Sequence, residues 1–133
     1  IQTFPSIAAR AESKYPVYAA HMRSLHQRHV DTVGKAVDAG VPVYAGTDAG
    51  GTIAHGQIPT EIRLLSQLRD PLFGLGAASW RARSWLTGDQ AAAGLGVGAA
   101  ADLLVLDADP RRDVTAIAHP TFVVLRGRVL RDR

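Results

Sequence analysis

The chain of 133 residues is 47% apolar and 20% charged, a composition typical of a globular protein with one core or at most two. It has no cysteine, which excludes disulfides and thiolate metal sites, so any metal ligand must be a His, Asp or Glu side chain. No apolar run approaches the roughly 18–20 residues of a membrane span, and no signal peptide is recognisable, so we expect a soluble, cytoplasmic protein.

The net charge is +3, and all but Lys14 and Lys35 of the 15 basic residues are arginines, which bind phosphate groups well. The arginines are scattered along the sequence, and those near the C-terminus have no aromatic residues between them. This distribution is typical of a solvated surface rather than of a nucleic-acid site. We therefore expect neither a nucleic-acid partner nor a membrane partner.

The N-terminal part of the sequence predicts a strand end, a loop and one long helix. Residues 1–4 are apolar enough to end a strand that Pro5 stops, and the polar stretch up to Lys14 is expected to be a loop. Pro16 favours the first turn of a helix, in which apolar residues then recur at spacings of three and four. Gly40 supplies the stop, so the helix has one buried stripe.

The middle of the chain predicts alternating strand and helix. Residues 41–45 are β-branched and aromatic, with apolar side chains on both faces, which predicts a buried strand of a parallel sheet. The Gly- and Ala-rich residues 46–56 predict a loop. A helix should follow from Pro59 to Asp70, and a further helix should span about residues 75–87.

The C-terminal part changes to a β pattern. Residues 102–107 predict a strand, and residues 121–130 predict a hairpin that turns at Arg126-Gly127-Arg128. We therefore expect an α/β part over residues 1–93 and an all-β part over residues 94–133.

Asp48 is the first candidate for chemistry. It stands at the C-terminal end of the predicted strand, where alternating α/β folds place their active sites, and small residues surround it. A carboxylate there could accept a proton from a metal-bound water. The alternative is that Asp48 only caps a turn, and its position alone leaves the two interpretations equal.

The other polar candidates are weaker. His55 and Glu61 fit no metal-binding helix pattern, and a role in ordering the loop is the more common one for such a pair. His21, His26 and His29 lie on the long helix without carboxylates at the right spacing, so they are expected to be structural.

Trp80 and Trp85 are expected to pack in a helix rather than to stack on bases. Residues 94–98 are Gly-rich but precede a strand, which excludes a dinucleotide-binding loop.

Two separated motifs resemble the metal-dependent amidohydrolase superfamily, in particular its imidazolonepropionase-like and prolidase-like branch. The first is residues 39–50, Ala-Gly-Val-Pro-Val-Tyr-Ala-Gly-Thr-Asp-Ala-Gly, with His55 and Glu61 downstream. The second is residues 101–110, Ala-Asp-Leu-Leu-Val-Leu-Asp-Ala-Asp-Pro, and residues 123–129 match as well. The resemblance covers nearly the whole chain, with both motifs in the family's order.

The resemblance implies the C-terminal part of a TIM-type β/α barrel, about strands seven and eight with their helices, followed by strands of a small β-sandwich. Asp48 would then be the eighth-strand carboxylate that ligates one divalent metal, usually zinc. It would also act as base toward water and as acid toward the leaving nitrogen. Thr47 and His55 would border the pocket of a small-molecule substrate, while Asp102 and Asp107 would be structural.

The resemblance also shows what this chain lacks. The family's His-x-His pair, its bridging Lys or Glu and its two later histidines have no counterpart here. One carboxylate cannot hold a zinc ion that needs three or four ligands. The isolated chain is therefore expected to be inactive, needing the missing N-terminal barrel part or a partner chain. The alternative is a non-catalytic, truncated or split piece that acts by packing against a partner, and a homo-oligomer remains open.

Overall fold

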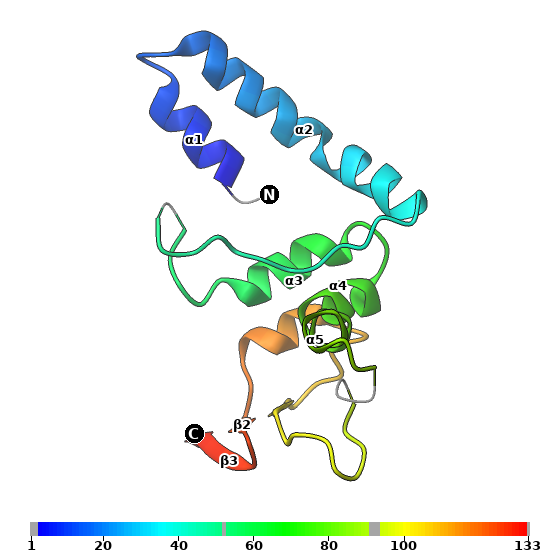
Figure 1. Ribbon diagram of the computed structural model, residues 1–133. Coiled ribbons are helices and arrows are strands. Elements are labelled where there is room, and N and C mark those ends of the chain that lie inside the picture. Colours follow the sequence, from blue (N-terminus) through cyan, green and yellow to red (C-terminus); the bar gives the residue numbers. More distant parts are fainter. Residues whose placement is uncertain (1–2, 52, 91–93, 133) are drawn as a thin grey trace.

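The computed structural model describes residues 3–51, 53–90 and 94–132 (Figure 1). Helices make up the first part of the chain and a small antiparallel sheet the last part. The elements, in chain order, are α1 (Thr3–Ala11), α2 (Pro16–Asp38), α3 (Ile58–Ser66), α4 (Pro71–Ala78), α5 (Trp80–Thr87), β1 (Leu103–Val105), the 3-10 helix η2 (Val114–Ala118), β2 (Phe122–Leu125) and β3 (Arg128–Asp132).

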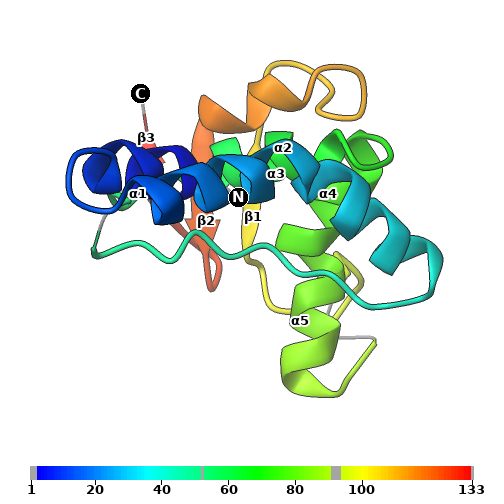
Figure 2. The same cartoon turned by 90° about the horizontal axis from the view of Figure 1, so that it is seen from above.

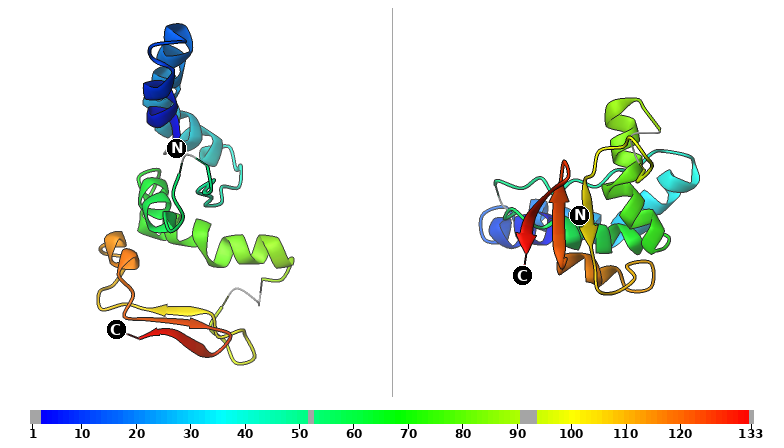
Figure 3. Two further views of the ribbon diagram at one scale, coloured as in Figure 1. Left: turned by 90° about the vertical axis from the view of Figure 1, so that its left-hand side faces the viewer. Right: turned by 90° about the horizontal axis from the view of Figure 1, so that it is seen from below.

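These elements form three tiers. The α1–α2 pair lies at one end, α3 to α5 lie in the middle, and the sheet with the C-terminus lies at the other end (Figure 1 and Figure 3, left). Seen from above, α5 projects sideways from the middle tier (Figure 2). Within the described ranges, none of the helices combines the length and the hydropathy that a bilayer span requires.

Helix α2 confirms the predicted long helix, including both of its ends. Pro16 occupies its first turn, where a missing N–H costs nothing. At the other end Gly40 has φ +83°, its N–H donates to the Val37 carbonyl, and the Val41 N–H donates to the Ala36 carbonyl. This is the pattern of a Schellman motif, for which glycine is suited because it has no Cβ.

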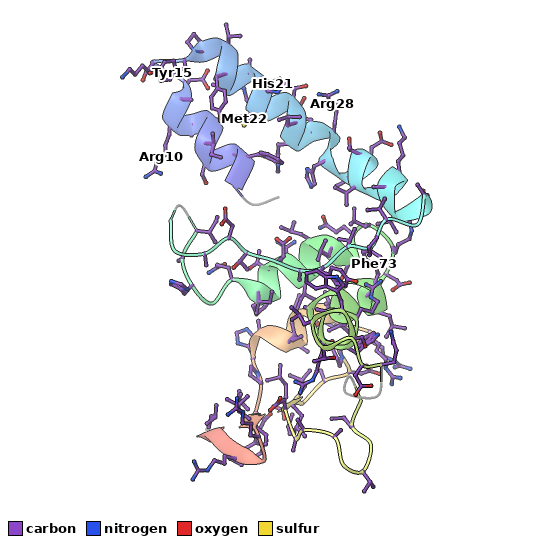
Figure 4. All side chains as sticks on the ribbon, viewed as in Figure 1. Arg10, Tyr15, His21, Met22, Arg28 and Phe73 are labelled. Atoms are coloured by element: carbon purple, nitrogen blue, oxygen red, sulfur yellow. The ribbon has the colours of Figure 1, made fainter. Side chains whose placement is uncertain are left out.

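The strand end predicted at residues 1–4 is wrong for residues 3 and 4, which belong to α1. Residues 1 and 2 lie outside the described residues. Pro5 falls in the first turn of α1, a position that tolerates proline. Ala8 and Ala11 are buried against Ala19 and Met22 of α2, and Met22 lies between the two helices in Figure 4. Because of this packing, much of the stretch that was predicted to be a loop up to Lys14 is helical.

The strand predicted at residues 41–45 is also wrong. These residues form no strand in the structure, and Val41 is 51% exposed. A strand needs a neighbour to accept and donate its ladder hydrogen bonds, and among the described residues the named sheet contains β1, β2 and β3 alone. The predicted parallel sheet is therefore absent from this part of the chain, and residues 41–48 run as an irregular segment across α3 and α4 (Figure 1).

The middle tier has a small core formed by Leu65, Leu68 and Ala77. Asp70 caps α4, since its carboxylate accepts a hydrogen bond of 2.8 Å from the Phe73 N–H. Helices α3 and α4 approach closely at Gly74, where a Cβ would lie 2.2 Å from Ser66 Oγ and 2.4 Å from the Ile62 carbonyl oxygen. Only glycine fits this crossing.

The helix predicted over about residues 75–87 is two helices, α4 and α5, because the backbone of Ser79 leaves the helical region with φ −132° and ψ −102°. Gly88 ends α5 in the left-handed conformation, so the predicted helix end near residue 87 is confirmed.

The sheet confirms the predicted strand and hairpin. Its order is β1-β2-β3, with antiparallel pairing throughout. Arg126 and Gly127 join β2 to β3 with φ of +51° and +75°, as a two-residue primed turn requires. The prediction of an all-β region is wrong in one respect, because η2 interrupts it and contacts α3. The predicted boundary between residues 93 and 94 stays a prediction.

Asp102 connects the sheet to α5. One of its carboxylate oxygens accepts a hydrogen bond of 2.7 Å from the Arg126 N–H, and the other accepts one of 2.9 Å from Arg83. Asp107 likewise accepts a hydrogen bond from the Thr121 hydroxyl, at 2.7 Å. These contacts agree with the structural role that the resemblance implies for both carboxylates.

The chain exposes more surface than a self-contained globule of its mass. Its accessible area is 8924 Å², whereas a monomeric protein of 14.1 kDa is expected to expose about 6,700 Å². The exposed side chains include large apolar ones on several elements. Among them are Val17, Val41, Trp85, Leu86, Val129 and Leu130. The described fold therefore lacks part of the packing that closes an ordinary core.

Gly74→Ala tests the α3–α4 crossing. We expect it to lower the free energy of unfolding by about 1–3 kcal/mol, because the added methyl group meets backbone as well as side-chain atoms. Gly34→Ala in α2 is the matched control. Nothing lies within 4 Å of its Cβ position, so it should stabilise the helix by about 0.5–1 kcal/mol. Thermal unfolding followed by circular dichroism measures both, and equal melting temperatures would contradict the close crossing.

The Asp102 contacts predict a dependence of stability on pH. The Arg126 N–H, and then the Arg83 guanidinium, lower the pKa of Asp102 below its usual 3.8. Because the folded state favours the carboxylate, the contribution is complete well above pH 3.8 and is lost as the pH falls through the lowered pKa. Asp102→Asn should remove this acid sensitivity. Arg83→Gln should weaken it but leave part of it, since the backbone N–H of Arg126 is the largest single cause of the lowered pKa. Unfolding midpoints between pH 2 and 7 would measure both.

Candidate active site

Asp48 lies on the loop that follows α2, with its side chain exposed. Its φ is +53°, a left-handed conformation that is uncommon for residues other than glycine and that Asp and Asn tolerate best. A strained backbone of this kind is found more often at functional sites than elsewhere, and it costs energy that the surroundings must supply. The structure therefore holds Asp48 in a defined but unusual conformation.

The segment before Asp48 is held from two sides. Val43 and Ala45 pack against the core of the middle tier, and the Ala45 N–H donates a hydrogen bond of 2.9 Å to the Ala77 carbonyl. Phe73, labelled in Figure 4, packs against the same core. Tyr44 instead stacks on Trp85 of α5, with ring centroids 4.8 Å apart and ring planes 22° apart.

The segment after Asp48 folds back on itself. Ala49 and Ile53 form an isolated β-bridge, and the Gly50 N–H donates to the Ile53 carbonyl at 3.0 Å. A Cβ at position 50 would lie 3.8 Å from Nε2 of His55, so the imidazole lies against the Gly50 backbone. The structure thus brings His55 back toward the residues that follow Asp48.

Thr47 is half-buried beside Asp48, so the three predicted site residues lie on one loop. Their roles stay predictions.

Glu61, the other polar residue of this region, is 6% exposed in the first turn of α3. His26 and His29 stack on each other with centroids 4.9 Å apart, and the Nδ1 atom of His29 lies against the His26 carbonyl oxygen. This arrangement agrees with the structural role expected for the histidines of α2. His21 lies on the same helix (Figure 4).

The sequence did not predict the contact between Tyr44 and Trp85. Trp85 was expected to pack in a helix; it lies in α5 and stacks on Tyr44 but is 63% exposed, and its partner could not be named from a single sequence. The signal available was the Tyr at the centre of an apolar stretch, on the face opposite Val43 and Ala45.

The described residues do not fit a metal ion by themselves. Among residues 3–51, 53–90 and 94–132 there is no group of three or more His, Asp or Glu side chains that could hold one. Zinc needs about three or four such ligands, and Asp48 could contribute one.

A carboxylate with a clearly lowered pKa lies elsewhere, in the β part, where hydrogen bonds from Arg111 hold the pKa of Asp109 at about 2. That pair is a structural feature of the turn after β1.

The chain is similar to uncharacterized proteins of Mycobacterium bovis and of two strains of Mycobacterium tuberculosis. Each is 48% identical over 129 residues, which is 96% of this chain and 34% of the relative. The chain thus spans about a third of the length of the curated relatives that it matches. No family model matches the sequence.

The fold is similar to that of a solved prolidase in complex with N-methylphosphonate-L-proline, with a TM-score of 0.77 and 25% identity. The match covers 99% of this chain and 33% of the prolidase. A crystal structure of an uncharacterized protein also has a TM-score of 0.77, with 24% identity over 98% of this chain and 34% of that one. The chain, a set of helices with a small antiparallel sheet, therefore matches the fold of about one third of a larger, prolidase-like protein.

Proposed function

We propose that the chain is the C-terminal third of a metal-dependent amidohydrolase that cleaves amide-type C–N bonds, with Asp48 as its acid and base. The observation that carries the proposal is the strained, exposed Asp48 on a loop within a fold that matches part of a prolidase. The motifs around Asp48 and over residues 101–110 support the same family.

The ligand of the solved prolidase suggests a substrate class. A methylphosphonate on the nitrogen of proline has a tetrahedral phosphorus where an acyl group would have its carbonyl carbon. This is the shape of the intermediate through which an amide passes when water attacks it. We therefore propose amides of the proline nitrogen, such as acyl- or aminoacyl-prolines, as substrates of the complete protein.

Asp48 would perform two proton transfers in this reaction. Its carboxylate accepts a proton from the attacking water as the oxygen bonds to the carbonyl carbon. The same carboxyl group then donates the proton to the nitrogen as the C–N bond breaks, so the carboxylate is regenerated. Thr47 and His55, on the same loop, would border the substrate.

The complete protein would need more than this chain contains. A divalent metal, for which zinc is the expected ion, would supply Lewis-acid assistance when bound. Asp48 is the one ligand that we assign within this chain, so the other ligands and the rest of the barrel must come from outside it.

Asp48→Asn tests the acid–base role in the complete hydrolase. We expect kcat to fall by about 10²–10⁴-fold, since an amide cannot accept the proton, while the left-handed backbone still suits Asn. The control is Asp31→Asn, which removes an exposed carboxylate paired with Lys35 on α2. Initial rates with an acyl-proline substrate measure the effect. Full activity in the Asp48 variant would exclude the proposal.

A second candidate function is supported by the exposed surface. The chain exposes about 2,200 Å² more than expected for its mass, an area comparable to that buried in obligate interfaces. Under this hypothesis the chain is a non-catalytic piece, a truncated paralogue or half of a split protein, that packs against a partner chain or a second copy.

Sedimentation of the isolated chain tests the need for a partner. We expect self-association or an expanded monomer, because apolar residues such as Val41 and Leu130 are uncovered. Addition of the remaining part of the protein should give a soluble complex of defined size. A compact monomer that unfolds cooperatively would argue against any requirement for a partner.

A further inference from the structure

We propose that His55 binds the free carboxylate of proline, so that the complete hydrolase is specific for substrates in which proline is the C-terminal residue. The inference rests on the proposed function, because it concerns the part of the substrate next to the nitrogen that Asp48 would protonate. It deepens that proposal by stating which group of the substrate His55 contacts and which substrates are rejected.

The substrate brings a negative charge close to Asp48. The ligand of the solved prolidase is a derivative of L-proline at its nitrogen, which leaves the proline carboxylate unsubstituted. The nitrogen and the carboxylate carbon of proline are both bonded to Cα and lie about 2.5 Å apart. A carboxyl group that protonates this nitrogen therefore lies near a second carboxylate. Because like charges at such a distance repel, the site needs a hydrogen-bond donor or a cation on the proline side.

His55 is the side chain of this region that can meet that need. Between Lys35 and Arg63 the sequence contains no other lysine, arginine or histidine. Glu61 in the same stretch is a buried carboxylate, so it cannot supply positive charge. An imidazole offers an N–H donor in its neutral form as well as in its protonated form, so it suits a carboxylate over a wide range of pH.

The loop between α2 and α3 folds back on itself, which returns His55 toward Asp48 (Figure 1). Ala49 and Ile53 form the β-bridge of this fold. Nε2 of His55 lies 3.8 Å from the position of a Cβ on Gly50. Gly50 follows Asp48 by two residues, so their Cα atoms are at most about 7 Å apart. Nε2 of His55 therefore lies within about 13 Å of the Asp48 Cα.

A single proline can contact both side chains within that limit. The path from the Asp48 carboxylate through the proline nitrogen to the proline carboxylate, and on to Nε2 of His55, measures about 9 Å, with a hydrogen bond of about 3 Å at each end. Position 50 carries no side chain, so the space beside Nε2 stays open. The loop thus offers one group for the nitrogen and one for the carboxylate of the same residue.

Both side chains are available for a substrate. Asp48 and His55 are exposed, and within the part of the chain that the structure describes neither side chain makes a hydrogen bond or an ion pair. Binding of proline by His55 would therefore break no existing contact.

The test compares the complete hydrolase with three variants on two substrates. N-acetyl-L-proline carries the free carboxylate, and N-acetyl-L-prolinamide has a neutral amide in its place. His55→Ala removes the imidazole, and His55→Arg retains a donor and a positive charge. Arg63→Ala is the matched control, because it removes an exposed cation from α3. The measurement is kcat and KM for each substrate, and circular dichroism of the 133-residue chain checks that each variant keeps its helices.

We expect KM for N-acetyl-L-proline to be about 10–100-fold lower than KM for the amide, the effect of one charge-assisted hydrogen bond. His55→Ala should raise KM for the carboxylate substrate by a similar factor and leave kcat, and KM for the amide, nearly unchanged. His55→Arg should restore most of the preference, and Arg63→Ala should not alter it.

Three results would overturn the inference. Equal KM values for the two substrates in the unaltered enzyme would show that the carboxylate is not recognised. An unchanged preference in His55→Ala would show that another residue binds it, and an equal loss in Arg63→Ala would show a general effect of charge.

Failure of the proposed function gives a different result. If the unaltered enzyme hydrolyses neither substrate, or if Asp48→Asn retains full activity, the proposed function is rejected. The dissociation constants of the same two compounds, measured by calorimetry with the unaltered enzyme and with His55→Ala, then decide separately whether His55 binds the carboxylate.

Discussion

The contact of residues 43–45 with the core of the middle tier is the constraint on which the rest of the arrangement depends. Ala77 contributes to this contact in two ways. Its side chain is fully buried, and its carbonyl oxygen accepts the hydrogen bond from the Ala45 N–H. Its position requires α4 to cross α3 closely, which only a glycine at position 74 permits. The loop that bears Asp48 is thus positioned by close backbone contacts, which small residues allow, rather than by the hydrogen bonds of a sheet.

Helix α5 extends this constraint to the rest of the molecule. On one side Trp85 contacts Tyr44 in the segment before Asp48. On another side Arg83 binds Asp102, which also accepts a hydrogen bond from the turn of the β2–β3 hairpin. A short helix of eight residues therefore connects the candidate site to the sheet. The structure gives it no side-chain cap at its N-terminus, and Gly88 ends it at the other end.

The features that the sequence predicted well are those that local chemistry determines. Pro16 and Gly40 define the ends of α2, and Gly127 defines the hairpin turn, because each acts within a few residues of itself. The placement of Asp48 in a loop after residues 41–45 was predictable for the same reason. Its strained backbone was not, since no residue pattern specifies it.

The features that the sequence predicted poorly depend on residues elsewhere. The two-sided apolar pattern of residues 41–45 is typical of a strand covered on both faces, whereas in the described structure Val43 and Ala45 pack on the middle-tier core and Tyr44 meets the largely exposed Trp85. The N-terminal residues became helical because α2 offers alanines and Met22 as a packing surface. The sequence could not identify Tyr44 as the partner of Trp85, because the stack joins residues that are remote in sequence.

The left-handed backbone of Asp48 has a consequence for how such a site is inherited. Asn suits this conformation as well as Asp does, and a single nucleotide change converts one codon into the other. Selection for folding alone would not remove that change, because it leaves the loop without added strain. A lineage can therefore lose the carboxylate and retain the shape, so under the proposed function the identity of residue 48 in relatives of this chain is more informative about chemistry than overall similarity.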